Sequence, residues 1–105
     1  MGGMQLRVRG TVSTCEQRTT TAGHPLLIVR LLDSASGQEV RATHLYPDAS
    51  AASHYAASNL ARQLRGQVAE LHATNPRFRP SRLDCEALHI VLPHIGQHTT
   101  RKDLE

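Results

Sequence analysis

The segment NPRFRPSR, residues 75–82, combines three arginines, two prolines and the only phenylalanine of the chain. A guanidinium group presents planar donors that suit phosphate, and an aromatic ring can stack on an unpaired base. The prolines stiffen the segment and reduce the entropy that it loses on binding. In an extended backbone Arg77 and Arg79 point away from Phe78, which predicts arginine contacts with phosphates and a ring that stacks on a base. The alternative is that Phe78 folds back as a lid over the core and that the arginines only solvate the segment.

Positive charge is concentrated in the first 82 residues. This part holds ten arginines and five acidic residues, a net charge of +5, whereas residues 83–105 hold two basic and four acidic residues, a net charge of −2. A basic surface indicates a polyanionic partner, such as a nucleic acid or an anionic membrane. Eleven of the twelve basic side chains are arginines, a bias that phosphate recognition and a GC-rich genome explain equally well.

Composition argues against several classes of protein. At 105 residues the chain is expected to form one domain, and its core must consist of Leu, Val, Ile and Ala because aromatic residues are scarce. No stretch reaches the ~18 consecutive apolar residues of a membrane span, and the N-terminal residues lack the apolar region of a signal peptide. We therefore expect a cytoplasmic protein without a membrane partner, in which Cys15 and Cys85 are reduced, buried and inert.

No group of residues has the spacing of a catalytic or metal site. Among the histidines only His94 and His98 are four residues apart, and Pro93 and Gly96 disfavour the helix that such a pair needs. No glycine-rich phosphate loop, carboxylate pair or Ser-His-Asp arrangement is recognisable. The sequence therefore predicts a binding protein that is not an enzyme and that needs no cofactor or metal.

Alternating hydrophobicity and turn residues predict five strands and one helix. The strands are expected at residues 4–12, 24–33, 38–47, 67–75 and 82–93, and the helix at residues 48–66. Gly10 stands where the first strand would bend or bulge, and the polar residues 13–23 are predicted to form a loop. In the last strand the apolar positions change parity between Ala87 and Leu88, which predicts a β-bulge or a strong bend.

The second strand carries apolar residues on both faces. If Arg30 faces water, the core side consists of Leu27, Val29 and Leu31. The arginine's side then holds Leu26, Ile28 and Leu32. One small barrel and one helix do not offer enough cover for these three residues, which favours a homodimer.

The predicted helix is rich in alanine, which favours helix formation. Asp48 or Ser50 can cap its start, and Gly66 suits the left-handed residue that ends it. Its expected buried stripe consists of Ala52, Tyr55, Ala56, Leu60 and Leu64. Arg62 and Arg65 suit the C-terminal end of the helix and lie away from the expected binding surface.

The order β-β-β-α-β-β is that of the OB-fold, an all-β fold in which a five-stranded Greek-key barrel carries one helix. OB-folds bind oligonucleotides on the face of strands two and three and with the 1–2 and 4–5 loops. Residues 75–82 fall in the 4–5 loop, Arg18 falls in the 1–2 loop, and Tyr46 offers a second ring for stacking. The candidate nucleic-acid-binding residues are Arg7, Arg9, Arg18, Arg30, Arg41, Arg77, Phe78, Arg79 and Arg82.

Four segments add a resemblance to a known family. They are LRVRGTV (6–12), the R…G-x-P spacing in RTTTAGHPLLIVRL (18–31), LARQLRGQVAEL (60–71) and LDCEALHIVL (83–92). In this order they resemble the bacterial single-stranded-DNA-binding proteins with an OB-fold, most of all the family of primosomal replication protein N (PriB). The resemblance covers roughly residues 4–93 and implies single-stranded DNA binding, a homodimer and contacts with replication proteins.

Residues and resemblance together predict a sequence-nonspecific, single-stranded nucleic-acid-binding protein, accessory to DNA replication or its restart at the primosome. DNA is the expected ligand, and RNA stays open. The alternative is an OB-fold protein-interaction module, an accessory subunit of a replication or mobile-element complex that does not itself bind nucleic acid. The OB-fold domain is expected over residues 1–93 and a flexible tail over residues 94–105, of which the final Leu-Glu could be left from expression.

Overall fold

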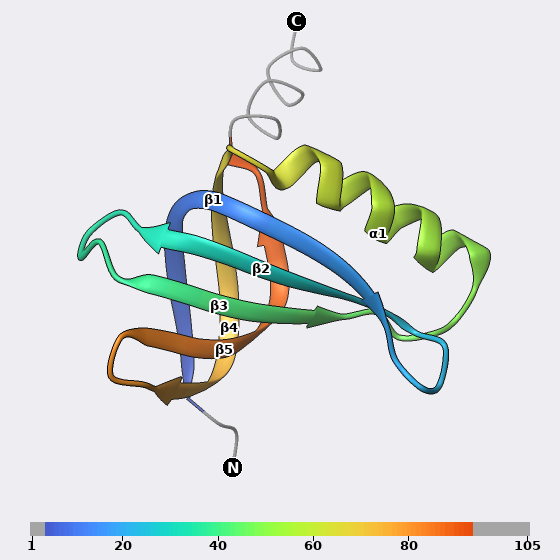
Figure 1. Ribbon diagram of the computed structural model, residues 1–105, viewed down its shortest axis with the longest axis horizontal. Helices are drawn as coiled ribbons and strands as arrows, with labels where there is room; N and C mark the ends of the chain where they lie inside the picture. Colours follow the sequence, from blue (N-terminus) through green and yellow to red (C-terminus); the bar gives the residue numbers. More distant parts are fainter. Residues whose placement is uncertain (1–3, 94–105) are drawn as a thin grey trace, which may run out of the picture.

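The computed structural model describes residues 4–93, which form a closed β-barrel with one helix beside it (Figure 1). Its elements in chain order are β1 (Gln5–Thr19), β2 (Pro25–Asp33), β3 (Glu39–Leu45), α1 (Ala51–Leu64), β4 (Val68–Phe78) and β5 (Arg82–Val91). The predicted tail at residues 94–105, and with it the spacing of His94 and His98, lies outside the described residues.

The barrel closes in the strand order β1-β2-β3-β5-β4. Neighbouring strands are antiparallel except β3 and β5, which pair in parallel from Glu39 opposite Arg82 to Thr43 opposite Glu86. The helix comes between β3 and β4 in the chain. This arrangement confirms the predicted fold, a five-stranded OB-fold barrel with a single helix.

β1 is longer than predicted and reaches Thr19, so the prediction of a loop at residues 13–23 is wrong for most of that stretch. The first half of the strand pairs with β4 and the second half pairs with β2, with a register shift between Val12 and Thr14. Beyond this shift Cys15 is the one buried residue of β1. The hydrophobic alternation that predicts a strand is therefore lost there, although the backbone pairing continues.

Gly10 lies where β1 passes from one partner strand to the other. It pairs with Ala69 of β4 and with Asp33 of β2. A Cβ atom at this position would lie 1.9 Å from the carbonyl oxygen of Leu32, so only glycine lets the two backbones approach this closely. This contact agrees with the predicted bend and allows β1 to curve across the barrel (Figure 1).

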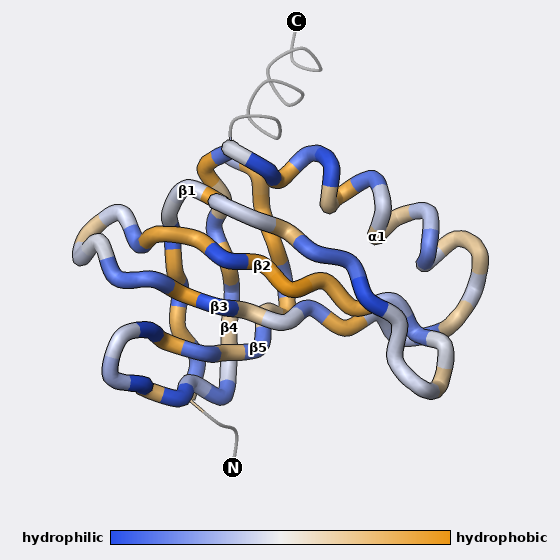
Figure 2. Tube along the Cα trace, in the orientation of Figure 1, coloured by the Kyte–Doolittle hydropathy of each residue, from blue (hydrophilic) through white to orange (hydrophobic). Residues whose placement is uncertain are grey.

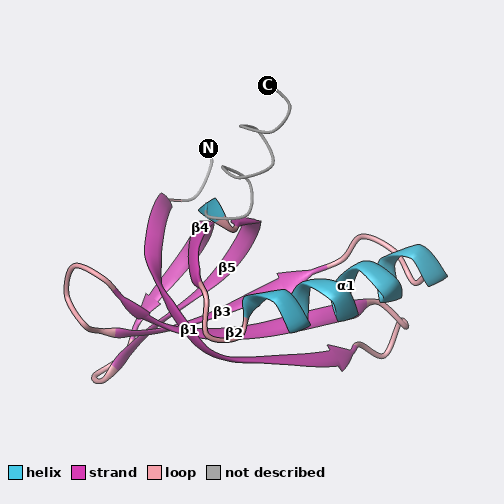
Figure 3. Ribbon diagram, turned by 90° about the horizontal axis from the view of Figure 1, so that it is seen from above, coloured by secondary structure: helices cyan, strands magenta, loops and turns pink. Residues whose placement is uncertain are grey.

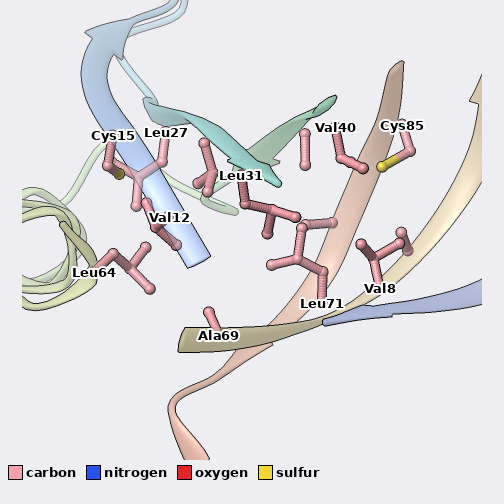
Figure 4. Close-up of a cluster of buried hydrophobic side chains, with 14 of the residues drawn as sticks. Val8, Val12, Cys15, Leu27, Leu31, Val40, Leu64, Ala69, Leu71 and Cys85 are labelled. Carbon is pink, nitrogen blue, oxygen red and sulfur yellow. The ribbon is translucent and has the colours of Figure 1, made fainter. Parts of the chain in front are cut away.

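The core is formed by inward-facing residues from all five strands and from one side of α1 (Figure 4). β2 contributes Leu27, Val29 and Leu31, each fully buried, as predicted. Figure 2 shows a nearly continuous apolar colour along β2, because its outward side is also apolar outside the one arginine. On that outward side Ile28 is buried, whereas Leu32 remains 52% exposed.

The helix begins close to the predicted position but turns a different side to the core. The Ser50 hydroxyl caps it by accepting a hydrogen bond from the backbone nitrogen of Ser53, and Gly66 beyond its end has a φ of 76°. Its buried residues are Ala57, Ala61 and Leu64, with Leu60 partly buried. The predicted stripe through Ala52, Tyr55 and Ala56 is therefore wrong. Alanine occurs on every side of this helix, so hydropathy does not fix its rotation, which packing against β1 and β2 decides (Figure 3).

No helix within residues 4–93 has the length and hydrophobicity needed to cross a membrane.

The last two strands form a longer hairpin than predicted. β4 extends to Phe78 and β5 begins at Arg82, so residues 75–82 are the tip of this hairpin and not an open 4–5 loop. The register of β4 and β5 shifts between His72 and Ala73, opposite Leu88. This irregularity is the β-bulge predicted from the parity of the last strand.

Candidate nucleic-acid interface

The tip of the β4–β5 hairpin is held by backbone pairing. The backbone nitrogen of Arg79 donates to the carbonyl oxygen of Arg82 at 2.8 Å, which closes a turn of four residues, 79–82. Asn75 has a φ of 53°, and the register shifts between Thr74 and Arg77. Asparagine tolerates this left-handed conformation better than most residues. The shift lets the segment carry arginines on one face of the hairpin and Phe78 on the other.

Phe78 is 73% exposed and therefore does not pack as a lid on the barrel. It lies opposite Leu83, whereas Arg77 lies opposite Asp84. Directly opposite residues of antiparallel strands share a face, so the ring and the arginine project from opposite faces of the hairpin. The ring is accessible to an unpaired base, but a base stacked there lies away from the arginines.

Arginines from β3, from β4 and from the turn after β4 meet in one groove of about 270 Å³ on the outer surface of the barrel. We call it the arginine groove. It is lined by Arg41, Thr43, Asn75, Arg77, Arg79, Asp84, Cys85 and Glu86. β3, β4 and β5 each contribute to it, because β5 pairs with both of the other strands. Predicted binding residues far apart in the sequence thus become neighbours.

Arg41 is the most unusual side chain of this groove. Its Nε atom is buried and has no hydrogen-bond partner among residues 4–93. Directly across the β2–β3 pair lies Arg30, a second positive charge on the same outer face. A buried donor without a partner costs about 1–3 kcal/mol, and like charges directly opposite each other destabilise a sheet. An anion bound between these side chains would remove both costs.

Acidic residues neutralise part of the groove. Asp84 accepts a hydrogen bond from Arg82 at 2.7 Å and another from Arg79 at 3.2 Å. The hydrogen bond from Arg82, and then that from Arg79, lower the pKa of the Asp84 carboxyl below its usual value. Within residues 4–93 no carboxylate forms an ion pair with Arg30, Arg41 or Arg77. These three keep the charge that is available for an anion.

Arg18 is exposed, but it lies in β1 and not in the predicted 1–2 loop. It forms an ion pair with Glu16 at 2.9 Å, and it lies opposite Leu26 of β2. The loop itself is confined to residues 20–24. Arg18 therefore projects from a strand, because β1 continues past its bulge, and Glu16 partly neutralises its charge.

Arg7 and Arg9 are not brought to the arginine groove. They project from the first half of β1 and lie opposite His72 and Glu70 of β4. Arg7 forms an ion pair with Glu70 at 3.8 Å. In the barrel order β4 and β5 separate this part of β1 from β3. We expected these arginines beside Arg41 because all three point outward from their strands. In a closed barrel, however, outward-pointing residues of different strands can lie on different sides of the molecule.

Tyr46 does not offer a second ring to the surface. It is half-buried and packs against the core, with its ring centroid 5.0 Å from that of His44. Burial raises the pKa of its phenol. The expectation that Tyr46 stacks on a base is therefore not supported by its position.

A second groove on the same outer surface escaped the sequence analysis. It holds about 530 Å³ and is lined by Thr20, Leu26, Thr43, Leu45, Glu86, Ala87 and Leu88. We call it the apolar seam. Leu45 is 57% exposed and Leu88 is 49% exposed. The sequence signal was the outward side of the second strand, where Leu26 was expected to need cover, but its neighbours Leu45 and Leu88 come from other strands.

The two cysteines of the chain lie in the core. Cys15 and Cys85 are both buried and form no disulfide. Burial raises the pKa of the Cys85 thiol to about 11 and also raises that of Cys15, so both thiols stay protonated at neutral pH. Residues 4–93 contain no group of three or more His, Cys, Asp or Glu side chains placed to hold a metal ion.

Comparisons with protein families and with curated proteins give no match that would indicate a function. The chain matches no protein-family model, and no curated protein is significantly similar to it. The site therefore rests on its own residues: a cationic groove with an unpartnered guanidinium nitrogen, an apolar seam beside it, and an exposed aromatic ring at the hairpin tip.

Proposed function

We propose that this protein binds single-stranded nucleic acid, and DNA above all, without sequence specificity. The observation that supports this most is the arrangement of Arg30 opposite Arg41, with a buried Arg41 Nε atom that has no partner in the described part of the chain. A phosphate oxygen is the acceptor that such a site lacks. Guanidinium contacts with phosphates carry no sequence information, so binding through them is insensitive to base sequence.

Preference for a single strand follows from Phe78. The ring is 73% exposed at the tip of the hairpin and is available to a base whose face is uncovered. Bases in a duplex already stack on their neighbours, so only unpaired bases can use this ring without an unstacking cost. The arginines provide attraction to any nucleic acid, and the ring adds preference for an unpaired strand.

The biological setting in this proposal comes from the resemblance of residues 4–93 to the primosomal replication protein N family. In this proposal the protein is an accessory to DNA replication or its restart and contacts replication proteins. Its cytoplasmic location is the expectation drawn from the cysteines and the N-terminal residues. A homodimer is part of the same proposal, because Leu32 on the outward side of β2 remains exposed on the surface. Sedimentation equilibrium at micromolar concentration tests it, and a monomer would remove the dimer.

Fluorescence anisotropy with labelled oligo-dT and with a duplex of equal length tests the binding proposal. Between three and five arginine–phosphate contacts predict a slope of log K against log salt of about −2 to −3.5, at ~0.7 per contact. The variant Arg77→Ala/Phe78→Ala/Arg79→Ala is expected to lose most of its affinity for oligo-dT. The matched control is Tyr55→Ala/Arg62→Ala, which removes an exposed ring and an exposed arginine from α1.

Wild-type protein that binds oligo-dT no more tightly than duplex, or with a slope near zero, would contradict the proposal. A complete absence of binding would favour the other candidate, a protein-interaction OB module. In that case the arginines would serve solubility or an acidic protein partner.

A further inference from the structure

We propose that the apolar seam receives the bases of the same strand whose phosphates lie in the arginine groove. This inference rests on the proposed function and goes beyond it by assigning a base-binding surface that contains no aromatic residue. The seam is formed where the outward sides of β2, β3 and β5 meet, at residues Leu26, Leu45 and Leu88.

The seam is continuous with the arginine groove. Thr43 and Glu86 line both hollows, and these two residues lie opposite each other in the β3–β5 pair. On the outward side of β3, Arg41 lies at the cationic end and Leu45 at the apolar end. Four residues of extended strand separate them by roughly 13 Å. In a nucleic-acid strand with a rise of about 3.4 Å per nucleotide, several nucleotides fit between these two ends.

The floor of the seam comes from side chains that stay on the surface. Leu26 and Leu45 lie directly opposite each other in the β2–β3 pair. Leu88 stands at the β-bulge of β5, where the register of the hairpin shifts. The Nδ1 atom of His44 lies 2.8 Å from the carbonyl oxygen of Ala87 and ties the end of β3 to β5 beneath the seam. The leucines thus form a fixed apolar floor that is open to solvent.

The hairpin itself gives the reason to expect bases there. Phe78 projects from the hairpin face opposite to Arg77, so bases of phosphates held in the arginine groove point away from the ring. The leucine floor lies on the same outer face of the barrel as Arg41 and Arg30. Apolar side chains cover a base face without reading its edge, which keeps the binding insensitive to sequence.

The experiment compares two oligonucleotides with the same phosphates. One is labelled oligo-dT, and the other is the same length with abasic sites in place of the bases. Leu45→Ser/Leu88→Ser is expected to weaken binding of oligo-dT about tenfold, which corresponds to ~1.4 kcal/mol, and to change binding of the abasic strand less than about twofold. Val68→Ser/Val91→Ser is the matched control, because these two residues are also exposed and apolar, come from β4 and β5, and line neither groove.

A second variant distinguishes lost base contacts from an unfolded protein, because it should bind more tightly than the wild type. Leu45→Phe adds a ring to the seam and is expected to strengthen binding of oligo-dT while leaving the abasic strand unchanged. Equal effects of both variants on the two oligonucleotides would overturn the inference. So would unchanged binding together with altered sedimentation, which would assign the seam to a second copy of the chain. If wild-type protein binds neither oligonucleotide, the proposed function fails instead, and these outcomes are distinguishable.

Discussion

Replacing Arg41 by methionine should weaken nucleic-acid binding and stabilise the fold at the same time. Methionine keeps the unbranched apolar stem but removes the charge and the donors. The buried Nε atom without a partner costs about 1–3 kcal/mol in the unbound protein. The like-charged Arg30 directly opposite adds about 0.2–1 kcal/mol. Because the side chain is only partly buried, we expect a net gain in unfolding free energy of about 1–2 kcal/mol for Arg41→Met.

Two measurements on Arg41→Met check this reasoning. A gain of 1 kcal/mol raises the Tm of a domain of this size by about 4–8 °C, so thermal unfolding followed by circular dichroism resolves it. Anisotropy of labelled oligo-dT over a salt series should show a slope reduced in magnitude by about 0.7, the value of one lost phosphate contact. Arg62→Met is the control, because Arg62 is exposed on α1 and should change neither quantity.

The opposite outcome would refute the account of the groove. If Arg41→Met lowers the Tm and leaves the salt slope unchanged, Arg41 stabilises the barrel and does not bind a phosphate. If both quantities fall, the side chain contributes to folding as well as to binding, and the charge repulsion with Arg30 has no measurable cost. Only higher stability of the variant combined with weaker binding agrees with a site in which the unpaired donor and the charge repulsion destabilise the unbound protein.

Three further predictions concern single residues. Phe78→Ala should weaken binding of oligo-dT by about 1–3 kcal/mol and leave the Tm unchanged, because the ring is 73% exposed; a lower Tm would mean that the ring packs on the barrel after all. Asp84→Asn should release Arg79 and Arg82, which tightens binding and steepens the salt slope; weaker binding would show instead that the carboxylate positions them. Burial raises the pKa of Cys85 to about 11, so its thiol favours the folded state in its neutral form. The free energy of unfolding should therefore fall as pH rises from about 9 to 11, and Cys85→Ala should abolish that part of the fall in urea titrations.

Local patterns in the sequence were sufficient for the fold. In the second strand Arg30 marks the outward side and predicts that Leu27 and Val29 are buried, because successive side chains of a strand point to opposite faces. The parity change at Ala87 and Leu88 predicts the bulge, and the order of strands and helix predicts the OB barrel. The sequence failed where this local signal was absent, beyond Val12 in β1 and around the alanine-rich helix.

The candidate site was only partly predictable, because it depends on contacts between strands that are far apart in the sequence. The sequence identified the arginines that line the groove, but it left open whether Phe78 is accessible or packs as a lid, which its exposure decides. It did not distinguish Arg7 and Arg9, which face a different side of the barrel, and it did not show that Asp84 neutralises two of the other arginines.

The sequence by itself determined the order of the elements, the inward side of each regular strand and the excess of positive charge. These depend on residues within a few positions of one another, whose periodicity the backbone geometry imposes. Only the tertiary structure decided that Arg30 faces Arg41 and that leucines from three strands form one seam. Strand register and the closure of the barrel decide which residues of different strands become neighbours. A bulge elsewhere in a strand changes that register, and the sequence around the neighbouring residues does not show the change.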